Sequence, residues 1–304
     1  MGGVNGEAID TLVKKFNDEN EYGITVDAQY QGEYDDSLNK LKSAQIGNMG
    51  ADLVQVYEIG TRFMIDSGWI VPMQQMIDAD SYDVSEIEPN LAAYYTIDNE
   101  LYSMPFNSST PIMYYNKDMF DAAGLDYPSA TEAMTWDEFV TLAKTLTLDA
   151  NGNNALSADF DKDNIVQYGC VVDNWTWQLE VWALSNGGRW FTEDGSACTI
   201  NDPKVIESIQ KVADLTLVEN CMPYNAGLED NGMQRSLLTG TVAMATAGAW
   251  NVGTCLATAR DEGLNYGVAR LPKMVNEVTI CTGGPQVVFS QTKHPEEAMN
   301  FIKW

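Results

Sequence analysis

The chain has 304 residues, of which 45% are apolar and 20% charged, and 17 basic against 44 acidic side chains give a net charge of −27. A chain of this length usually divides into two domains, and its composition is that of a globular protein. The acidic balance argues against nucleic acid and anionic membrane surfaces as partners, because clustered lysine and arginine bind both. Five scattered cysteines without metal spacing are expected to be isolated buried thiols.

Helix and strand patterns alternate in the first sixty residues. The expected elements are a helix at 6–20, a strand at 24–30, a helix at 33–46 and a strand at 51–56. This alternation predicts a sheet with parallel strands and helices on its faces. Ligands of such sheets bind beyond the carboxyl ends of the strands, where Tyr34 and Glu58 are expected to stand.

The segment 105–120, PFNSSTPIMYYNKDMF, holds two prolines around a run of small polar residues. Each proline fixes its own φ and favours an extended residue before it. The segment is therefore predicted to be an extended crossing between domains that offers hydrogen-bonding side chains to a polar ligand: Asn107, Ser108, Ser109 and Thr110. An ordinary loop rich in serine and threonine is the alternative interpretation.

The second half of the chain continues the α/β pattern. Thr135 and Glu138 have the spacing of a capping box, and Pro203 is expected to open a helix capped by Asp202. Further helices are expected at 117–123, 175–184 and 233–238, strands at 241–245, 266–269 and 286–289, and a tight turn at 283–285.

The sequence gives only weak signals for metal binding and for catalysis. Asp159, Asp161 and Asp163 partly match a calcium loop, but position six is asparagine and position twelve is Cys170, so a solvated acidic loop is preferred. The lone histidine, His294, has no visible partner for a catalytic triad. No cofactor is expected, and a carboxylate pair of the glycosidase kind stays open because acids are abundant.

The two ends of the chain suggest a fragment. No export signal is visible near Met1, and the amphipathic segment 296–304 ends without a glycine cap. A chain truncated at both ends is therefore expected. No run of 18 apolar residues is present to span a bilayer.

Several strings resemble one family. They are QVYEIGTRFM (55–64), PFNSSTPIMYYNKDMFDAAGLD (105–126), AMATA (243–247), NYGVARLP (265–272) and TGGP (282–285). In order and spacing these resemble the family 1 extracellular solute-binding proteins of ABC importers, with the strongest likeness to the branch that binds sn-glycerol 3-phosphate. The first two strings carry most of the specificity.

The resemblance implies a two-lobe α/β periplasmic-binding-protein fold of the type II kind. Lobe one would be residues 1–106 plus 254–304 and lobe two 112–250, with hinge crossings near 107–111 and 250–254. The family's function would make the chain an extracytoplasmic receptor, periplasmic or lipid-anchored, that captures a ligand by hinge closure. It would deliver this ligand to the transmembrane subunits of an ABC permease and would not be an enzyme.

The family's binding residues carry over to individual positions. The resemblance places ligand contacts at Tyr34, Glu58, Ser109 and Gly284, with the neighbours Asn107 and Ser108 as further candidates. A serine of the glycerol phosphate receptors falls on Gly248, so that hydroxyl is missing. A stacking tryptophan corresponds to Trp175 or Trp177.

The residues themselves favour a different class of ligand from the one that the resemblance implies. Phosphate esters are best held by an arginine fork, whereas Gly248 and Trp250 offer room and a stacking face for a sugar ring. A neutral mono- or oligosaccharide is therefore expected, with sn-glycerol 3-phosphate or a glycerophosphodiester as the alternative and a carbohydrate-active enzyme as the alternative of another class. The competing interpretations are a solvated helix start for Glu58 and plain core for one of the tryptophans.

Overall fold

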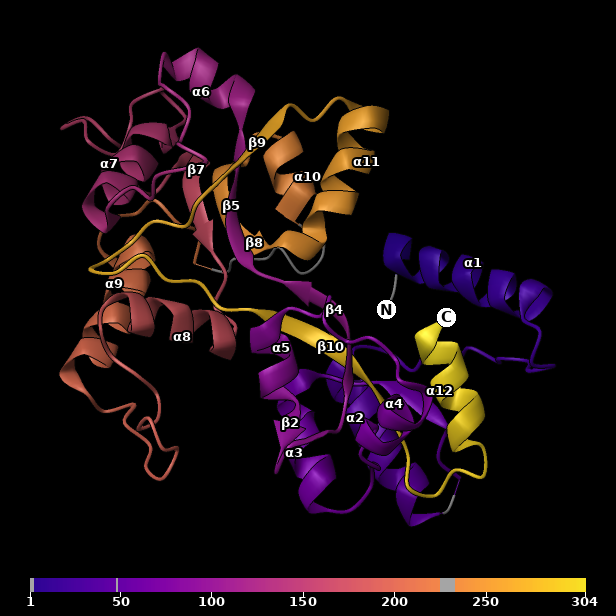
Figure 1. The fold of residues 1–304 in the computed structure, drawn as a ribbon. Coiled ribbons are helices and arrows are strands. Elements are labelled where there is room, and N and C mark those ends of the chain that lie inside the picture. Colours follow the sequence, from indigo (N-terminus) through magenta and orange to yellow (C-terminus); the bar gives the residue numbers. More distant parts are fainter. Residues whose placement is uncertain (1–2, 48, 225–232) are drawn as a thin grey trace. The chain divides into compact units, whose positions relative to one another are not determined.

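The computed structural model describes residues 3–47, 49–224 and 233–304, and it divides into two compact units (Figure 1). Unit 1 comprises Met1–Ser109 and Cys281–Trp304, and unit 2 comprises Thr110–Ile280. The chain therefore passes between the units at residues 109–110 and 280–281. The expected second crossing near 250–254 is wrong, because the strand at 266–269 pairs with the strand at 111–116 and holds this region in unit 2.

The sheet of unit 1 is antiparallel, not parallel as expected. It has the order β1 (Leu53–Gln55), β10 (Thr282–Val288) and β4 (Met104–Ser109), with β10 antiparallel to both neighbours. Residues 24–30 form no strand. The Asn17 side chain occupies both backbone groups of Val26, accepting from its N–H at 2.7 Å and donating to its carbonyl at 2.9 Å. Because residues 24–30 do not join the sheet, β1 pairs with β10, and β4 is the third strand; both lie outside the first sixty residues.

Helices cover both faces of this sheet, as strand alternation requires. Val287 faces a cluster with Leu41 and Met64, and Val288 faces a cluster with Met73 and Met299. The elements of unit 1 besides its sheet are α1 (Gly3–Glu19), α2 (Tyr34–Ile46), α3 (Glu58–Asp66), α4 (Gln74–Asp80), α5 (Pro89–Tyr94), β2 (Thr96–Ile97), β3 (Glu100–Leu101) and α12 (Pro295–Lys303).

The first and last helices of the chain pack together in unit 1. Phe16, on the apolar face of α1, is fully buried. Its ring centroid lies 4.9 Å from that of Phe301 and 5.3 Å from that of Trp304, both in edge-to-face geometry. Val13 of the same helix is also buried, whereas Leu12 is 45% exposed. These aromatic contacts join the two ends of the chain within unit 1.

Unit 2 is built on a five-stranded mixed sheet. Its order is β6 (Leu148–Asp149), β7 (Ile165–Val172), β8 (Val242–Gly248), β5 (Pro111–Asn116) and β9 (Tyr266–Ala269). β7 and β8 are parallel, and the remaining neighbours are antiparallel. Alternate residues of β5 serve opposite faces, since Met113 and Tyr115 join one core cluster and Tyr114 joins another.

The helices of unit 2 lie in two groups. Helices α7, α8 and α9 contribute to the cluster on one face, and α10 and α11 to the cluster on the other (Figure 1). The predicted capping box of α7 is confirmed by the Thr135 and Glu138 side chains, and Asp202 caps α9. The remaining bounds are α6 (Lys117–Ala123), α7 (Trp136–Leu146), α8 (Thr176–Ser185), α9 (Pro203–Leu217), α10 (Met233–Leu238), η1 (Ala249–Asn251) and α11 (Val252–Glu262).

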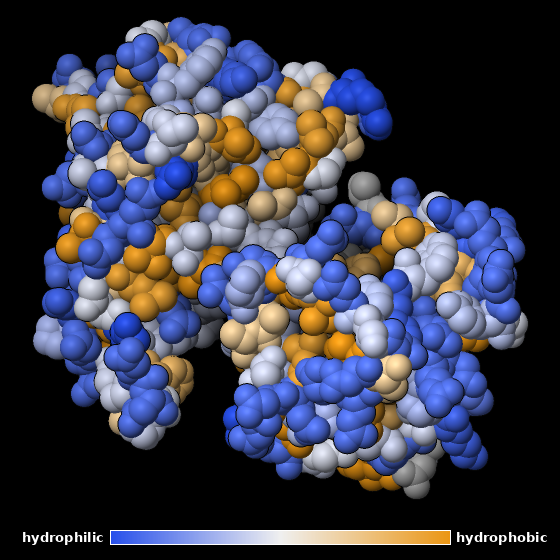
Figure 2. Space-filling model, in the orientation of Figure 1, coloured by the Kyte–Doolittle hydropathy of each residue, from blue (hydrophilic) through white to orange (hydrophobic). Residues whose placement is uncertain are grey.

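Hydrophilic residues make up most of the visible surface (Figure 2), in keeping with the charge of −27. No helix within the described ranges is long and apolar enough to cross a membrane. The expectation of isolated buried thiols holds for Cys255 but is wrong for others. Cys198 and Cys281 are exposed, and Cys170 lies beside Cys221, donating its backbone N–H to the Cys221 carbonyl at 3.1 Å.

Candidate functional site

In unit 1, Glu58 is the first residue of α3, three positions beyond the end of β1. Its Oε1 accepts from the Thr282 hydroxyl of β10 at 2.5 Å, and its Oε2 is buried without a hydrogen-bond partner among the described residues. Burial raises the pKa of Glu58, while the bonds from Thr282 and the backbone of Gly283 act in the opposite direction. The free oxygen can accept one more hydrogen bond.

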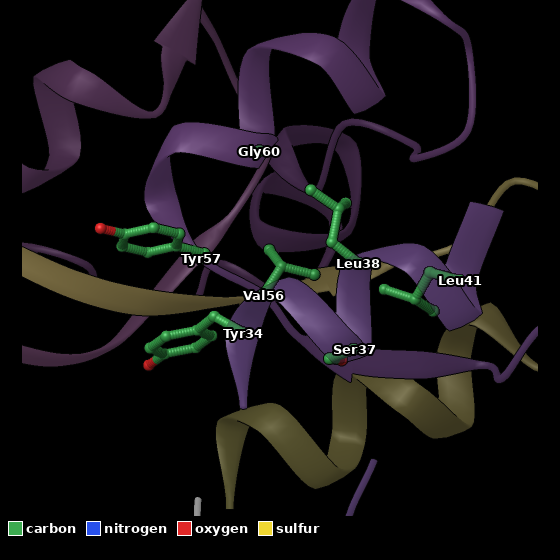
Figure 3. Close-up of a pocket in the computed structure, with 7 residues that line it drawn as sticks. All are labelled: Tyr34, Ser37, Leu38, Leu41, Val56, Tyr57 and Gly60. Carbon is green, nitrogen blue, oxygen red and sulfur yellow. The ribbon is translucent and has the colours of Figure 1, made fainter. Parts of the chain in front are cut away.

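Two tyrosines stack beside this carboxyl group. The rings of Tyr34 and Tyr57 lie nearly parallel with centroids 4.9 Å apart, and both hydroxyls point away from Leu38 and Leu41 (Figure 3). These residues line a pocket of about 10 Å³, the room of one water molecule. Burial and the Glu58 charge raise the pKa of Tyr57 to about 12, so its hydroxyl is a donor at neutral pH.

Gly284 leaves space for the hydroxyl of Tyr34. A Cβ at Gly284 would lie 2.6 Å from the Tyr34 hydroxyl oxygen and 2.5 Å from the Gln55 amide nitrogen, so only glycine fits without displacing them. The backbone N–H of Gly284 donates to Asn107 Oδ1 at 2.6 Å. The tight turn expected at 283–285 is wrong, because this segment pairs with β4 and only its register shifts between Gly284 and Pro285.

The serines of β4 differ in environment. The Ser108 hydroxyl is exposed and lies 2.7 Å from Cys281 Sγ. The Ser109 hydroxyl is buried without a hydrogen-bond partner in the described structure, and Ser109 pairs with Thr282 across the sheet. Ser109, which pairs with Thr282, and Glu58, which accepts from it, thus each hold an unsatisfied polar atom.

In unit 2, the end of β8 carries an aromatic corner. A Cβ at Gly248 would lie 2.0 Å from the ring of Trp250, so the indole covers the glycine directly. The rings of Trp177 and Trp250 meet edge to face with centroids 5.5 Å apart. Trp250 is 43% exposed. The missing hydroxyl at Gly248 is thus replaced by a partly exposed indole surface.

Polar groups follow β7 next to this corner. Asp173 comes directly after β7, and its backbone N–H donates to Thr246 Oγ1 at 3.3 Å. The Gln178 amide nitrogen donates to the same oxygen at 3.1 Å. Burial raises the pKa of Asp173 to about 6, opposed by hydrogen bonds from the backbone of Asn174 and Trp175. Trp175 itself is 59% exposed at the start of α8.

The aspartates that partly match a calcium loop, a weaker interpretation than a solvated acidic loop, do not assemble as ligands. No group of three acidic, histidine or cysteine side chains in the described ranges could hold a metal ion. The loop is organised instead by Asp149, which accepts from the backbone N–H groups of Asn151, Asn153 and Asp161 at 2.8 to 2.9 Å. Asp161 binds the amide of Asn164 at 2.7 Å.

The predicted site residues therefore fall into two sets. Unit 1 holds Tyr34, Glu58, Asn107, Ser108, Ser109 and Gly284, and unit 2 holds Trp175, Trp177, Gly248 and Trp250. Sequence reasoning missed Tyr57, Thr282 and Asp173. The first two lie inside the QVYE and TGGP strings, and this position could have marked them as candidates. Asp173 has no such signal in the sequence, because its surroundings depend on the β7–β8 pairing.

Comparison with known proteins identifies the family. The model for bacterial extracellular solute-binding proteins matches residues 3–304. The sn-glycerol-3-phosphate-binding periplasmic protein UgpB of Brucella abortus (strain 2308) is 31% identical over 285 residues, which cover 90% of this chain and 60% of that protein. The chain thus spans about 60% of the length of such curated relatives.

Solved structures agree on the fold. The substrate-binding protein Lmo0181 of Listeria monocytogenes, in complex with cycloalternan, has a TM-score of 0.84 and 24% identity over 98% of this chain and 71% of its own. A solute-binding protein of Thermotoga lettingae bound with α-D-tagatose has a TM-score of 0.82 and 25% identity, covering 98% and 72% of the two chains. The chain has the two-lobe α/β fold of these proteins, and it belongs to the family of bacterial extracellular solute-binding proteins.

Proposed function

We propose that this protein is the extracytoplasmic receptor of an ABC importer and that it captures a neutral mono- or oligosaccharide for a membrane permease. The proposed ligand contacts are the polar and tyrosine side chains near Glu58 in unit 1 and the tryptophan corner in unit 2, and the proposed capture is by closure about the crossings at 109–110 and 280–281. It is not an enzyme. Membership of the extracellular solute-binding family supports transport, and relatives with bound carbohydrates support the ligand class.

One observation favours a sugar over a phosphate ester. The Trp250 ring covers Gly248 and meets Trp177 at an angle, which leaves a partly exposed indole surface at the end of β8. Indole faces pack against the C–H surfaces of sugar rings and add an N–H donor at the rim. In unit 1, the free carboxyl oxygen of Glu58 is an acceptor for a hydroxyl group. Hydroxyl donors and C–H faces occur together in carbohydrates.

A second candidate is sn-glycerol 3-phosphate or a glycerophosphodiester. The 31% identity to the B. abortus receptor favours it. A glycerol moiety could donate to Glu58 as a sugar does, so unit 1 alone does not separate the two classes. Unit 2 would discriminate between the two ligand classes, because a phosphate there would meet indole surface and the carboxylate of Asp173 in place of cationic donors.

Calorimetry and tryptophan fluorescence test the proposal with maltose, D-tagatose and cycloalternan as neutral ligands and with sn-glycerol 3-phosphate and glycerophosphocholine as the phosphate set. Saturable binding of a neutral sugar without turnover is the expected result, and Trp250→Ala should weaken it at least tenfold. Release of product from an oligosaccharide would support the carbohydrate-active enzyme instead. Binding of the phosphate set alone would replace the sugar by the second candidate.

Hinge closure has a test of its own. Each side of the crossings is tied by a side-chain contact, Ser108 to Cys281 at 2.7 Å in unit 1 and Thr110 to Thr279 at 2.6 Å in unit 2. The proposed hinge residues are therefore the ones between these contacts, Ser109 on one strand and Ile280 on the other. Small-angle scattering with saturating sugar should show a smaller radius of gyration, and an unchanged radius at saturation would contradict closure.

A further inference from the structure

Asp173 lies at the edge of the unit 2 sheet that also carries the aromatic corner. β7 and β8 run parallel, and Val172 is in register with Thr246. Asp173 therefore follows β7 beside the last residues of β8, at roughly the 4.8 Å spacing of neighbouring strands. β8 ends at Gly248, the residue that Trp250 covers. A carboxyl group and an indole are thus brought to one end of two adjacent strands.

The Asp173 carboxyl group is held in place but only partly satisfied. The backbone N–H groups of Asn174 and Trp175 donate to it, while its own N–H is fixed on Thr246. None of the ion pairs in the described residues includes Asp173. A carboxylate has about four acceptor positions, so this group can accept further hydrogen bonds.

A second unsatisfied acceptor lies in the same place. Gln178 is completely buried, and its amide nitrogen shares Thr246 Oγ1 with the Asp173 backbone. Its Oε1 is buried without a partner in the part of the chain that the structure describes. A buried acceptor without a donor destabilises the folded state, and such groups are rare unless a ligand or water completes them.

We propose that Asp173 is a ligand-binding and specificity-determining residue, which accepts hydroxyl groups of a neutral sugar and excludes phosphate esters. This inference rests on the receptor function proposed above. A sugar hydroxyl donates to the carboxylate and replaces the water lost on burial. A phosphate dianion brings acceptors and a like charge to the same position, and like charges repel most strongly where water is excluded. Asp173 therefore complements Glu58, which offers its free oxygen in unit 1.

The test is calorimetry of the wild type, Asp173→Asn and Asp163→Asn with maltose, D-tagatose, cycloalternan and sn-glycerol 3-phosphate. Asp163 is an exposed carboxylate of the same unit, so its variant controls for net charge. We expect the Kd for the bound sugar to rise tenfold or more in Asp173→Asn and less than twofold in Asp163→Asn. The affinity for sn-glycerol 3-phosphate should be unchanged or higher in Asp173→Asn.

The possible outcomes distinguish a failure of the proposed role of Asp173 from a failure of the proposed receptor function. Sugar binding that is equal in the wild type and Asp173→Asn would overturn the role of Asp173 and leave the receptor intact. Binding of sn-glycerol 3-phosphate but no sugar by the wild type would overturn the selection against phosphate. No binding of either set would refute the receptor function, and the role of Asp173 with it. Should Asp173→Asn fail to fold, Asp173→Ser removes the same charge in a smaller side chain, with an unchanged thermal melt as the folding control.

Discussion

Replacing Asp173 by asparagine should stabilise the unliganded protein, and the gain should depend on pH. Burial raises the pKa of this carboxyl group from 3.8 to about 6. At roughly 1.4 kcal/mol per pKa unit, keeping it ionised in the folded state costs about 3 kcal/mol. Because the folded pKa is the higher one, the folded state binds more protons between pH 4 and 6, so the cost is absent below pH 4 and complete above pH 6.

Urea unfolding at pH 4, 5, 6 and 7 measures this cost. Six of the eight tryptophans lie in unit 2, so tryptophan fluorescence mainly reports the unit that contains Asp173. The unfolding free energy of Asp173→Asn minus that of the wild type should increase by up to about 3 kcal/mol from pH 4 to pH 7. The variant Asp163→Asn should show no such increase. A difference that stays flat across this range would refute the partly buried carboxylate without an ion-pair partner on which the argument depends.

Three further changes have distinct expected results. Gly283→Ala places a Cβ 2.1 Å from a backbone oxygen of β4, which cannot move aside, so the melting temperature should fall by several degrees, as a thermal melt will show. In Gly248→Ala the atoms nearest to the new Cβ belong to the partly exposed ring of Trp250, a side chain that can shift, so the protein should stay folded with a shifted tryptophan emission spectrum and weaker sugar binding. Thr282→Val removes the bond to Glu58 and should raise the pKa of that carboxyl further. As the pH is lowered, fluorescence titrations should therefore show the variant losing sugar affinity at a higher pH than the wild type does. Thr282→Ser should restore the wild-type pH dependence.

Local signals in the sequence predicted local structure well. The capping box of Thr135 and the Pro203 helix start depend on residues within one helical turn, and both are present. The polar crossing at 105–120 became β4 and β5, because each proline sits at a strand end or an edge where an extended backbone is already required. These features need no information about distant parts of the chain.

The errors came from pairings between distant segments. Alternation at residues 24–30 predicted a strand, yet Asn17 took the backbone groups of Val26 that a neighbouring strand would have used. The glycines at 283–284 suggested a turn, but their small size serves close contact instead, with Asn107 of β4 and with Tyr34. Glycine permits both tight turns and close approach, and only the sheet partner decides which applies.

The candidate site was predicted in part for the same reason. The resemblance placed ligand contacts at Tyr34, Glu58 and Gly284, and the structure holds all three in unit 1, where contacts of 2.5 to 3.5 Å connect their surroundings. They could not supply Asp173, since its chemistry follows from being beside the end of β8 and from its burial. A burial-dependent pKa is a property of the folded chain and leaves no local pattern.

Overall likeness and local chemistry carry different information about the ligand. The 31% identity to a glycerol phosphate receptor extends over most of the chain, and identity of that kind mainly preserves a fold. Ligand choice depends on the few side chains at the strand ends, where Trp250 covers Gly248 at the end of β8 and Asp173 follows the neighbouring strand β7. An indole face stabilises a sugar ring and gives nothing to a phosphate, and a carboxylate accepts from hydroxyls and repels a dianion. Both features act in the same direction and support the proposal of a neutral sugar as the ligand.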